Sequence, residues 1–354
     1  MEKERIAWID IVKLLAIIAV FCGHFGPETG NLYAFVFQYH VPLFFFVSGI
    51  FAGHLEQLSF RKAVKKRFEQ IIVPYFFLVT MTMIVIIVTQ ENDFITYLKY
   101  LKQFIWGIRN RMYAPALWFF SCLFCTSILF EVLRRLLRHK TLLFAAAICI
   151  YVLSVTVFPN RPSAQPSWFF NVDSACYYLL YYTFGYLGSE RLQKTKRDSN
   201  GEGLGRKIVS LMGIAVLVCY TVLVYIGEDM DIAYKTIYRI LPAANEIYPI
   251  VRTILLILFH LILAQLLAGF GKLADAGTQT LWLCGNEFIV KQIFNAAVSI
   301  VGLQIAITSA LGALVYAAAM TAFIIKVLMP IEMKLYRKYI DFIRQFWPAL
   351  SEKI

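Results

Sequence analysis

The amino-acid sequence predicts an all-α, polytopic integral membrane protein with about ten transmembrane helices and with both termini in the cytoplasm. Of its 354 residues, 60% are hydrophobic and only 16% are charged. A soluble domain is usually about 45–50% apolar and about 25% charged. Long apolar runs also recur along the chain. The composition therefore excludes a disordered chain, a nucleic-acid-binding protein and an ordinary soluble enzyme, and it indicates lipid surroundings.

Apolar runs of the required length predict the spans, because a helix needs about 20 mostly apolar residues to cross the hydrocarbon core. The first run follows basic residues, as a signal peptide does, but it contains two charges and no clear cleavage site, so we expect it to be retained. The last run is long, and we expect it to tilt or break. The predicted spans are 6–26, 33–53, 71–90, 114–133, 141–158, 172–190, 208–227, 249–270, 279–298 and 303–329.

The distribution of Lys and Arg predicts the orientation of these spans. With a cytoplasmic N-terminus, the inner connections and tails carry 23 basic residues and the outer connections carry 7. Basic loops are retained on the cytoplasmic side of a membrane. An even number of spans then returns the C-terminus to the cytoplasm.

Two domains follow from this arrangement. Residues 1–333 form the membrane domain, in which the polar, glycine-rich stretch 191–207 is a cytoplasmic loop between two groups of spans. Residues 334–354 alternate basic and aromatic side chains and predict an amphipathic helix on the inner leaflet, with a solvated tail as the alternative. The seven cysteines lie in apolar runs, so we expect no disulfide framework. We interpret Cys122 and Cys125 as packing residues, with a redox or metal pair as the alternative.

The first span carries three polar groups that lipid disfavours, Asp10, Lys13 and His24. Asp10 and Lys13 are three residues apart, so their side chains are neighbours on a helix. Lys13 and His24 differ by about 1100° of helical rotation, which places them on one face about 16 Å apart along the axis. These polar residues along one helix, here called the polar stripe of the first span, predict a functional groove. The alternative is a structural ion pair and a buried histidine with satisfied hydrogen bonds.

Further polar features follow along the chain. His40 precedes Pro42, which predicts a bend or loosened turn, and Ser48 with Gly49 offers a close helix contact. The basic run 61–67 has two interpretations, namely topology with anionic lipid or docking of a polyanion such as the phosphates of an acyl carrier. Other polar or aromatic candidates inside or beside the spans are Trp118, Asp173, Asn286, Glu287, Lys291 and Lys326.

These residues resemble the motifs of the acyltransferase-3 family of bacterial integral-membrane O-acyltransferases, especially its fucose 4-O-acetylase-like branch. The resemblance spans nearly the whole chain in order. It is carried by Ile9-Asp10-Ile11-Val12-Lys13 with His24, by His40-x-Pro42-Leu43-Phe44-Phe45-x-x-Ser48-Gly49, by the basic run before Pro74-Tyr75, by Leu117-Trp118-Phe119-Phe120 and by Thr280-Leu281-Trp282.

The resemblance implies a multi-pass enzyme of the bacterial cytoplasmic membrane. It would move an acyl group, usually acetyl, from cytoplasmic acyl-CoA to a hydroxyl of a cell-envelope or lipid-linked glycan. It implies that His24 is the catalytic histidine and that Lys13 stands where arginine is commoner. Of two arginines expected before Pro74, Arg67 matches the first and Gln70 occupies the second position. The histidine that many members have in a late helix has no counterpart at 283–287.

This chemistry assigns three groups of residues. His24 would take the proton of the acceptor hydroxyl, since histidine is a base near neutral pH. Asp10 and Lys13 would set the local electrostatic field or contact the pantetheine arm or phosphates of acyl-CoA. Direct attack on the thioester and an acyl-histidine intermediate both stay open. Lys65, Lys66 and Arg67 would hold the phosphates of acetyl-CoA. His40, Ser48, Trp118 and Asp173 would contact the acceptor.

No metal is implied, because His24 and His40 have no carboxylate or thiolate at ligand spacing. The principal alternative function is a transporter or flippase for a glycan or small solute, which also uses intramembrane charges, and a membrane scaffold is a third. Binding of acetyl-CoA would distinguish the enzyme from both. The acceptor, its reacting hydroxyl and the oligomeric state stay open.

Overall fold

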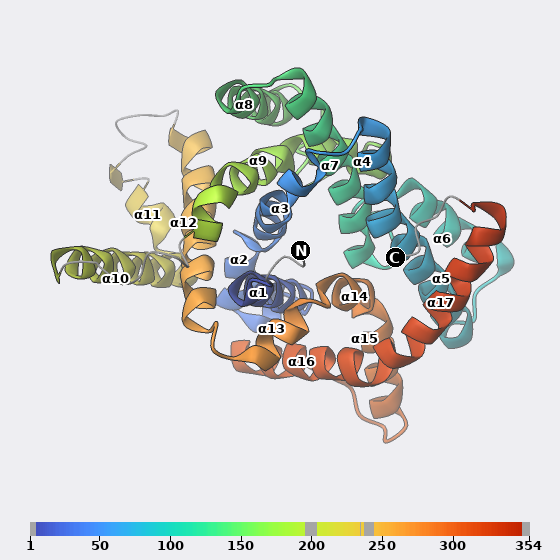
Figure 1. The fold of residues 1–354 in the computed structure, drawn as a ribbon. Helices are drawn as coiled ribbons and strands as arrows, with labels where there is room; N and C mark the ends of the chain where they lie inside the picture. Colours follow the sequence, from blue (N-terminus) through green and yellow to red (C-terminus); the bar gives the residue numbers. More distant parts are fainter. Residues whose placement is uncertain (1–4, 195–203, 234, 237–243, 349–354) are drawn as a thin grey trace. The chain divides into compact units, whose positions relative to one another are not determined.

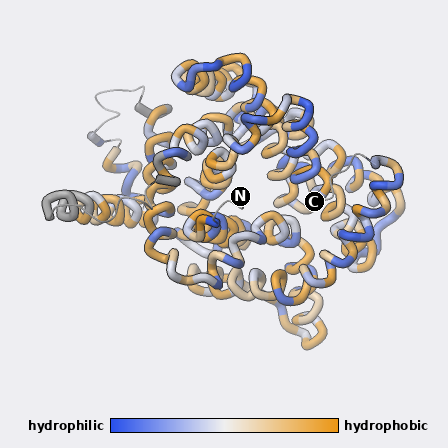
Figure 2. Tube along the Cα trace, viewed as in Figure 1, coloured by the Kyte–Doolittle hydropathy of each residue, from blue (hydrophilic) through white to orange (hydrophobic). Residues whose placement is uncertain are grey.

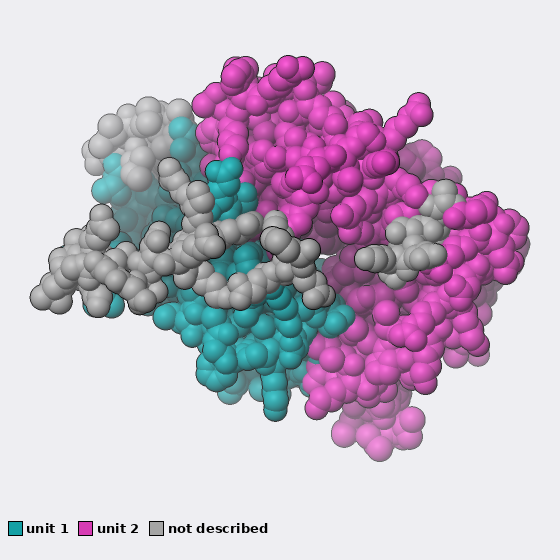
Figure 3. All heavy atoms as spheres, viewed as in Figure 1, with its two compact units in different colours: residues 1–47, 189–280, 306–321 teal, residues 48–188, 281–305, 322–354 magenta. Residues whose placement is uncertain are grey.

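The computed structural model describes residues 5–194, 204–233, 235–236 and 244–348, and every regular element in these ranges is helical (Figure 1). The chain divides into two compact units, each assembled from segments that are distant in sequence (Figure 3). Unit 1 contains residues 1–47, 189–280 and 306–321, and unit 2 contains residues 48–188, 281–305 and 322–354.

Unit 1 is organised around its first helix. Its helices are α1 (Ala7–Gly23), η1 (Pro27–Thr29), α2 (Asn31–Val36), α10 (Leu204–Ile226), α11 (Asp229–Ala233), α12 (Ala244–Leu266) and α13 (Gly271–Gly277), together with the first parts of α3 (His40–Ile50) and α16 (Ala310–Phe323). Helix α1 packs against α2, α12 and α13 (Figure 1). A methyl group at Gly277 would lie 1.8 Å from the carbonyl oxygen of Asp10, so only glycine permits this approach of α13 to α1.

Unit 2 contains most of the remaining helices. They are η2 (Ala52–Leu55), α4 (Phe60–Arg67), α5 (Val73–Thr89), α6 (Phe94–Trp106), η4 (Pro115–Leu117), α7 (Trp118–Leu136), α8 (Lys140–Thr156), η5 (Phe169–Asn171), most of α9 (Val172–Lys194) and of α14 (Thr280–Gly285), α15 (Glu287–Ser299) and α17 (Met329–Phe346). A methyl group at Gly49 would lie 1.9 Å from the carbonyl oxygen of Tyr182. The close helix contact predicted at Ser48-Gly49 is therefore confirmed, with α9 as the partner.

Two π-helical turns interrupt long helices, and each is followed closely by a proline. Turn η3 (Phe68–Ile72) joins α4 to α5 just before Pro74, and η7 (Ile324–Leu328) joins α16 to α17 just before Pro330. Proline has no N–H to donate and its ring crowds the preceding turn. A widened turn relieves both problems without ending the helix. The last predicted span, which we expected to tilt or break, therefore continues through a π turn as part of one helix, Ala310–Phe346.

Hydrophobic residues line most helices of both units (Figure 2). Five described helices are long and apolar enough to cross a membrane, namely Asn31–Ile50, Phe60–Thr89, Pro115–Leu136, Ile247–Leu266 and Ala310–Phe346, and Lys140–Thr156 and Leu211–Ile226 are shorter apolar helices. Large apolar side chains are exposed on such helices, with 78% of Val88 and 65% of Leu211 uncovered. Surfaces of this kind need lipid rather than water, so the protein is a membrane protein.

Several predicted boundaries differ from the structure. The turn expected near His40 lies at residues 37–39, immediately before α3. The apolar run 279–298 is divided between α14 and α15, which are separated at Asn286. The predicted outer connection 91–113 contains the helix α6. Part of the predicted loop 191–207 and the end of the predicted tail 334–354 lie outside the described residues, and α17 covers the first part of that tail.

Candidate functional site

The polar stripe of the first span lies on α1 in unit 1. Asp10 is 7% exposed, and its carboxylate accepts an ion pair from the Lys13 Nζ at 2.6 Å. Arg5, which precedes the helix, donates from Nε to Asp10 at 2.7 Å and from Nη1 to Asp275 at 2.7 Å. These hydrogen bonds raise the pKa of Arg5 above its ordinary value, and the bond with Asp10 has the larger effect. Asp10 therefore holds two cations at the start of α1.

His24 follows the last residue of α1. Its backbone N–H still bonds to the carbonyl oxygens of Val20 and Phe21, at 3.1 and 3.0 Å. The helical register therefore extends to this residue, and the spacing of about 16 Å from Lys13 along the axis applies. The residue is half-buried. Helix α1 thus carries a buried ion pair at one end and an imidazole at the other.

Two further histidines of unit 1 have fixed ring orientations. The Nδ1 atom of His40 lies 2.6 Å from the carbonyl oxygen of Val36, and that of His260 lies 2.7 Å from the carbonyl oxygen of Leu256. A carbonyl can only accept, so Nδ1 carries the proton in each ring and Nε2 keeps the lone pair when the ring is neutral. His260, which the sequence did not indicate as a site residue, stacks on Tyr39 with ring centroids 4.1 Å apart.

The basic residues of α4 in unit 2 differ in their partners and exposure. Lys65 Nζ pairs with Glu69 at 3.5 Å, and Arg67 donates to the Tyr182 hydroxyl at 3.1 Å. Lys66 is exposed. Among the described residues, the buried Nε atom of Arg67 has no hydrogen-bond partner. The run leads directly into the π turn η3, and such turns are frequent at functional sites.

Trp118 and Asp173 also lie in unit 2, and the structure gives each a defined local role. The Arg109 guanidinium lies over the Trp118 ring, 4.7 Å from its centroid. Asp173 is 2% exposed and accepts the backbone N–H groups of Ser167 and Ser174, at 2.6 and 2.8 Å. Its carboxylate thus fixes the loop before α9. A direct contact of Asp173 with an acceptor stays a prediction.

A hydrogen-bond network around Asn171, which the sequence did not predict, supports the region of Trp118 and Asp173. Asn171 is fully buried and has a φ of 54°. Its amide nitrogen donates to the Gly107 carbonyl and, at 3.0 Å, to Ser121 Oγ, while its amide oxygen accepts the Arg109 backbone N–H at 2.8 Å. A left-handed asparagine next to a helix start is a local signal for such a turn. Its partners are distant in sequence and could not be identified from spacing.

A second buried polar group lies at the interruption between α14 and α15. Glu287 pairs with Lys291, as the four-residue spacing predicts. The amide nitrogen of Asn286 donates to the Glu332 carboxylate at 2.6 Å. Glu332, on α17, was not predicted, because nothing in its local sequence indicates a partner 46 residues away.

The predicted site residues therefore form two groups. Asp10, Lys13, His24 and His40 belong to unit 1, and the structure brings Asp10 and Lys13 into direct contact. The second group belongs to unit 2 and consists of Ser48, Lys65, Lys66, Arg67, Trp118 and Asp173. Within that group, Ser48 lies beside the α3–α9 contact at Gly49, and Arg67 reaches α9 at Tyr182.

Comparison with known protein families identifies the chain. A model of the acyltransferase-3 family, described as an acyltransferase domain, matches residues 6–329. No curated protein and no solved structure gives a significant match. The matched range begins just before α1 and contains the whole predicted site. The resemblance of the motifs is thus confirmed at the level of the family, and the chain belongs to the acyltransferase-3 family of acyl-transferring enzymes.

Proposed function

We propose that the protein transfers an acyl group, in the simplest case acetyl, from cytoplasmic acyl-CoA to a hydroxyl of a cell-envelope or lipid-linked glycan at the bacterial cytoplasmic membrane. Family membership supports acyl transfer and favours an enzyme over a transporter or a scaffold. The observation that carries the proposal further is α1, which holds a buried Asp10–Lys13 pair near its start and has His24 directly after its last residue, all within the matched range.

In the proposed reaction, neutral His24 takes the proton of the acceptor hydroxyl as its oxygen attacks the thioester carbonyl. A carbon–oxygen bond forms, the carbon–sulfur bond breaks, and the CoA thiolate leaves and takes up the proton from the His24 imidazolium, which returns His24 to its neutral form. General-base catalysis of this kind contributes about 10²–10⁴-fold. Asp10 holds Lys13 in place near the start of α1, where the Lys13 ammonium would contact the pantetheine arm or the phosphates of acyl-CoA. Asp10 therefore acts as a positioning residue.

The cations of α4 would hold the phosphates of the acyl carrier. Lys66 is exposed, and Arg67 presents a buried Nε atom that has no hydrogen-bond partner among the described residues. Charge-assisted hydrogen bonds from such groups are the strong ones for phosphate. Lys65 is held partly by Glu69, so we assign it a smaller share.

Replacement of His24 tests the proposal. His24→Ala and His24→Gln should lower acetyl transfer in purified, detergent-solubilised protein by about 10²-fold or more. The measurement is release of CoA from acetyl-CoA together with mass spectrometry of envelope glycans from cells with each variant. His139→Ala is the matched control, because His139 is exposed before α8 and should leave the rate unchanged. Normal transfer by His24→Ala would remove His24 from the mechanism.

A further inference from the structure

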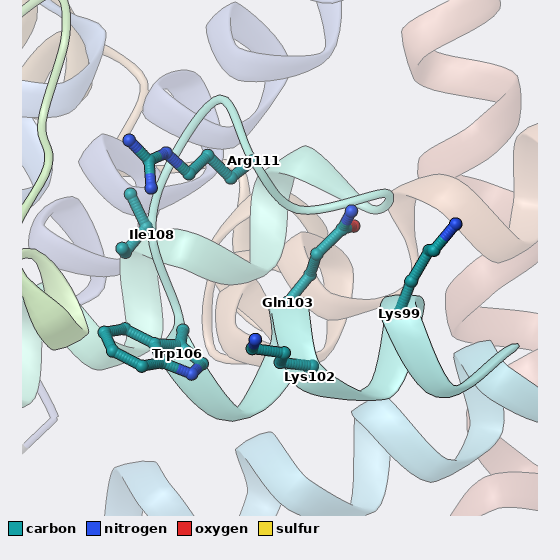
Figure 4. Close-up of a pocket in the computed structure, with 6 residues that line it drawn as sticks. All are labelled: Lys99, Lys102, Gln103, Trp106, Ile108 and Arg111. Atoms are coloured by element: carbon teal, nitrogen blue, oxygen red, sulfur yellow. The ribbon is translucent and has the colours of Figure 1, made fainter. Parts of the chain in front are cut away.

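Unit 2 contains a cavity of about 430 Å³ beside the amphipathic helix α6. Four of its lining residues come from the helix and two from the loop that follows it (Figure 4). They are Lys99, Lys102, Gln103, Trp106, Ile108 and Arg111. None of them belongs to the site proposed for acyl transfer. The cavity lies in the connection that the charge distribution places on the outer side of the membrane.

The charge of the cavity selects an anion. Within the described part of the chain, no carboxylate lies at ion-pair distance from Lys99, Lys102 or Arg111. The charge of Asp93, at the start of α6, acts on Lys99 only at longer range. Three cations and the Gln103 amide therefore line one space, and this set of donors suits a phosphate.

An apolar stripe on the same helix indicates that the anion has a lipid tail. Phe94, Leu98 and Ile105 are exposed by 74%, 48% and 48%. Their positions fall within about 40° of helical rotation, and Lys102 lies only about 40° beyond Leu98. A helix with an apolar stripe beside a basic one lies in the membrane interface. A ligand of this helix would thus have its tail in the lipid and its anionic head in the cavity.

The size of the cavity and its aromatic residue indicate that the head is larger than a phosphate. Ligand cavities of about 300–1,000 Å³ hold whole small molecules, whereas one water takes about 30 Å³ of liquid. Trp106 is half exposed and contacts Phe169 edge-on, with ring centroids 5.9 Å apart. Its indole offers an apolar face and one N–H donor, which suits the face and hydroxyls of a pyranose ring.

We propose that the α6 cavity binds the phosphate and first sugar of a membrane-anchored saccharide, so that the acceptor class of this enzyme is a polyprenyl-phosphate-linked glycan. The assignment as acceptor rests on the proposed function, whereas the binding itself does not. Lys99, Lys102 and Arg111 hold the phosphate, Trp106 contacts the sugar, and the apolar stripe of α6 contacts the prenyl chain.

Equilibrium binding tests this proposal without acyl-CoA. The probe is a radiolabelled polyprenyl phosphate carrying one hexose, with the full-length protein in detergent. Replacing Lys99, Lys102 and Arg111 together by Gln should weaken binding about 100-fold, because each cation contributes substantially to the attraction of an anionic lipid head. Lys102→Glu alone changes only one exposed side chain and should also weaken binding. Arg161→Gln is the control, since Arg161 is an exposed cation of the next predicted outer connection and does not line the cavity.

Two competitors identify the occupant. Unlabelled polyprenol without phosphate should not displace the probe, and phosphatidylglycerol at equal concentration should displace little of it. Equal binding by the wild type, Lys102→Glu and the triple variant would overturn the proposal, as would equal displacement by phosphatidylglycerol, which would make the cavity a general site for anionic lipid. Because no transfer is measured, a failure here leaves the His24 experiment intact, and the reverse also holds.

Discussion

Asp10 lies between two cations and should be more important for stability than for chemistry. Asp10→Asn removes the charge that Lys13 meets at 2.6 Å while Lys13 stays largely buried, with 23% of its side chain exposed. A hydrogen bond to a charged group is worth about 2 kcal/mol. We expect the free energy of unfolding to fall by about this amount, and transfer to fall about tenfold because Lys13 loses its position. Thermal unfolding in detergent and initial rates measure both effects.

Asp275→Asn is the matched control for that change. It removes a second carboxylate from Arg5, but Asp275 has 70% of its side chain exposed and Arg5 has 47%. Exposed ion pairs contribute little because water and salt screen them. We expect unchanged stability and transfer. Equal effects of the two substitutions would contradict the assignment of Asp10 as the residue that positions Lys13.

The sequence predicts the ion-pair partner of a residue where both partners lie close together along one helix. The spacing of three between Asp10 and Lys13, and of four between Glu287 and Lys291, was enough to predict both pairs. Arg5 was not predicted as a third partner, because it precedes α1 and helical spacing does not apply to it. Long-range partners, such as Asn286 with Glu332, have no local signal at all.

At the scale of elements, Gly49 allows α3 to approach α9. A methyl group there would meet the Tyr182 carbonyl oxygen at 1.9 Å, and a backbone atom cannot move aside as a flexible side chain can. We expect Gly49→Ala to lower the free energy of unfolding by about 1–3 kcal/mol. Gly213→Ala, on α10, is the control, because nothing lies within 4 Å of the added methyl. Differential melting in detergent distinguishes the two, and equal melting of both variants would disprove the close contact.

Helix α6 should lose stability in acid. Asp93 caps it by accepting the Thr96 backbone N–H at 2.8 Å, and hydrogen bonds from Thr96 lower the pKa of Asp93 below its ordinary value of 3.8. The stabilising contribution is therefore present above that ordinary value and is lost as pH falls through the folded-state pKa. Asp93→Asn keeps a capping side chain that does not titrate.

Hydrogen exchange of the α6 amides measures this effect. After correction for intrinsic rates, protection in the wild type should fall as the pH is lowered below the ordinary Asp93 pKa of 3.8. In Asp93→Asn the drop should be smaller, while protection near neutral pH stays similar. A drop of the same size in both proteins would show that another group controls the acid sensitivity of α6.

The sequence predicted elements well where one apolar run makes one helix, as in α5 and α8. The prediction failed where a helix is not a long apolar run, and where a long apolar run is not one helix. Helix α6 was assigned to a connection, because lysines interrupt its apolar positions and a search for 20-residue runs passes over it. The run 279–298 is mostly apolar and long enough to span, yet α14 ends at Gly285. A methyl group there would lie 2.3 Å from the Leu78 side chain, a packing constraint that hydropathy does not contain.

At the scale of the whole molecule, composition was sufficient to predict a helical membrane protein, and the family match is consistent with that class. The number of spans is harder to predict. Five described helices are long and apolar enough to span, whereas ten runs were predicted. Helix α1 has only 17 residues, which is short for a span. Helix α9 is long enough, with 23 residues, but its tyrosines and other polar residues lower its mean hydropathy. Such helices are buried by protein neighbours, and hydropathy does not distinguish this environment from lipid.

Orientation is the whole-molecule prediction on which the proposed chemistry depends, because acyl-CoA is cytoplasmic and the α6 cavity should face outward. In a cysteine-free background, Glu91→Cys and Gln57→Cys place single thiols at exposed positions before α6 and before α4. A membrane-impermeant maleimide should label Glu91→Cys in intact cells. It should label Gln57→Cys only after permeabilisation, because the basic α4 is retained inside. The reverse pattern would place α4 on the side that lacks acyl-CoA and would contradict its assignment as the phosphate-binding helix.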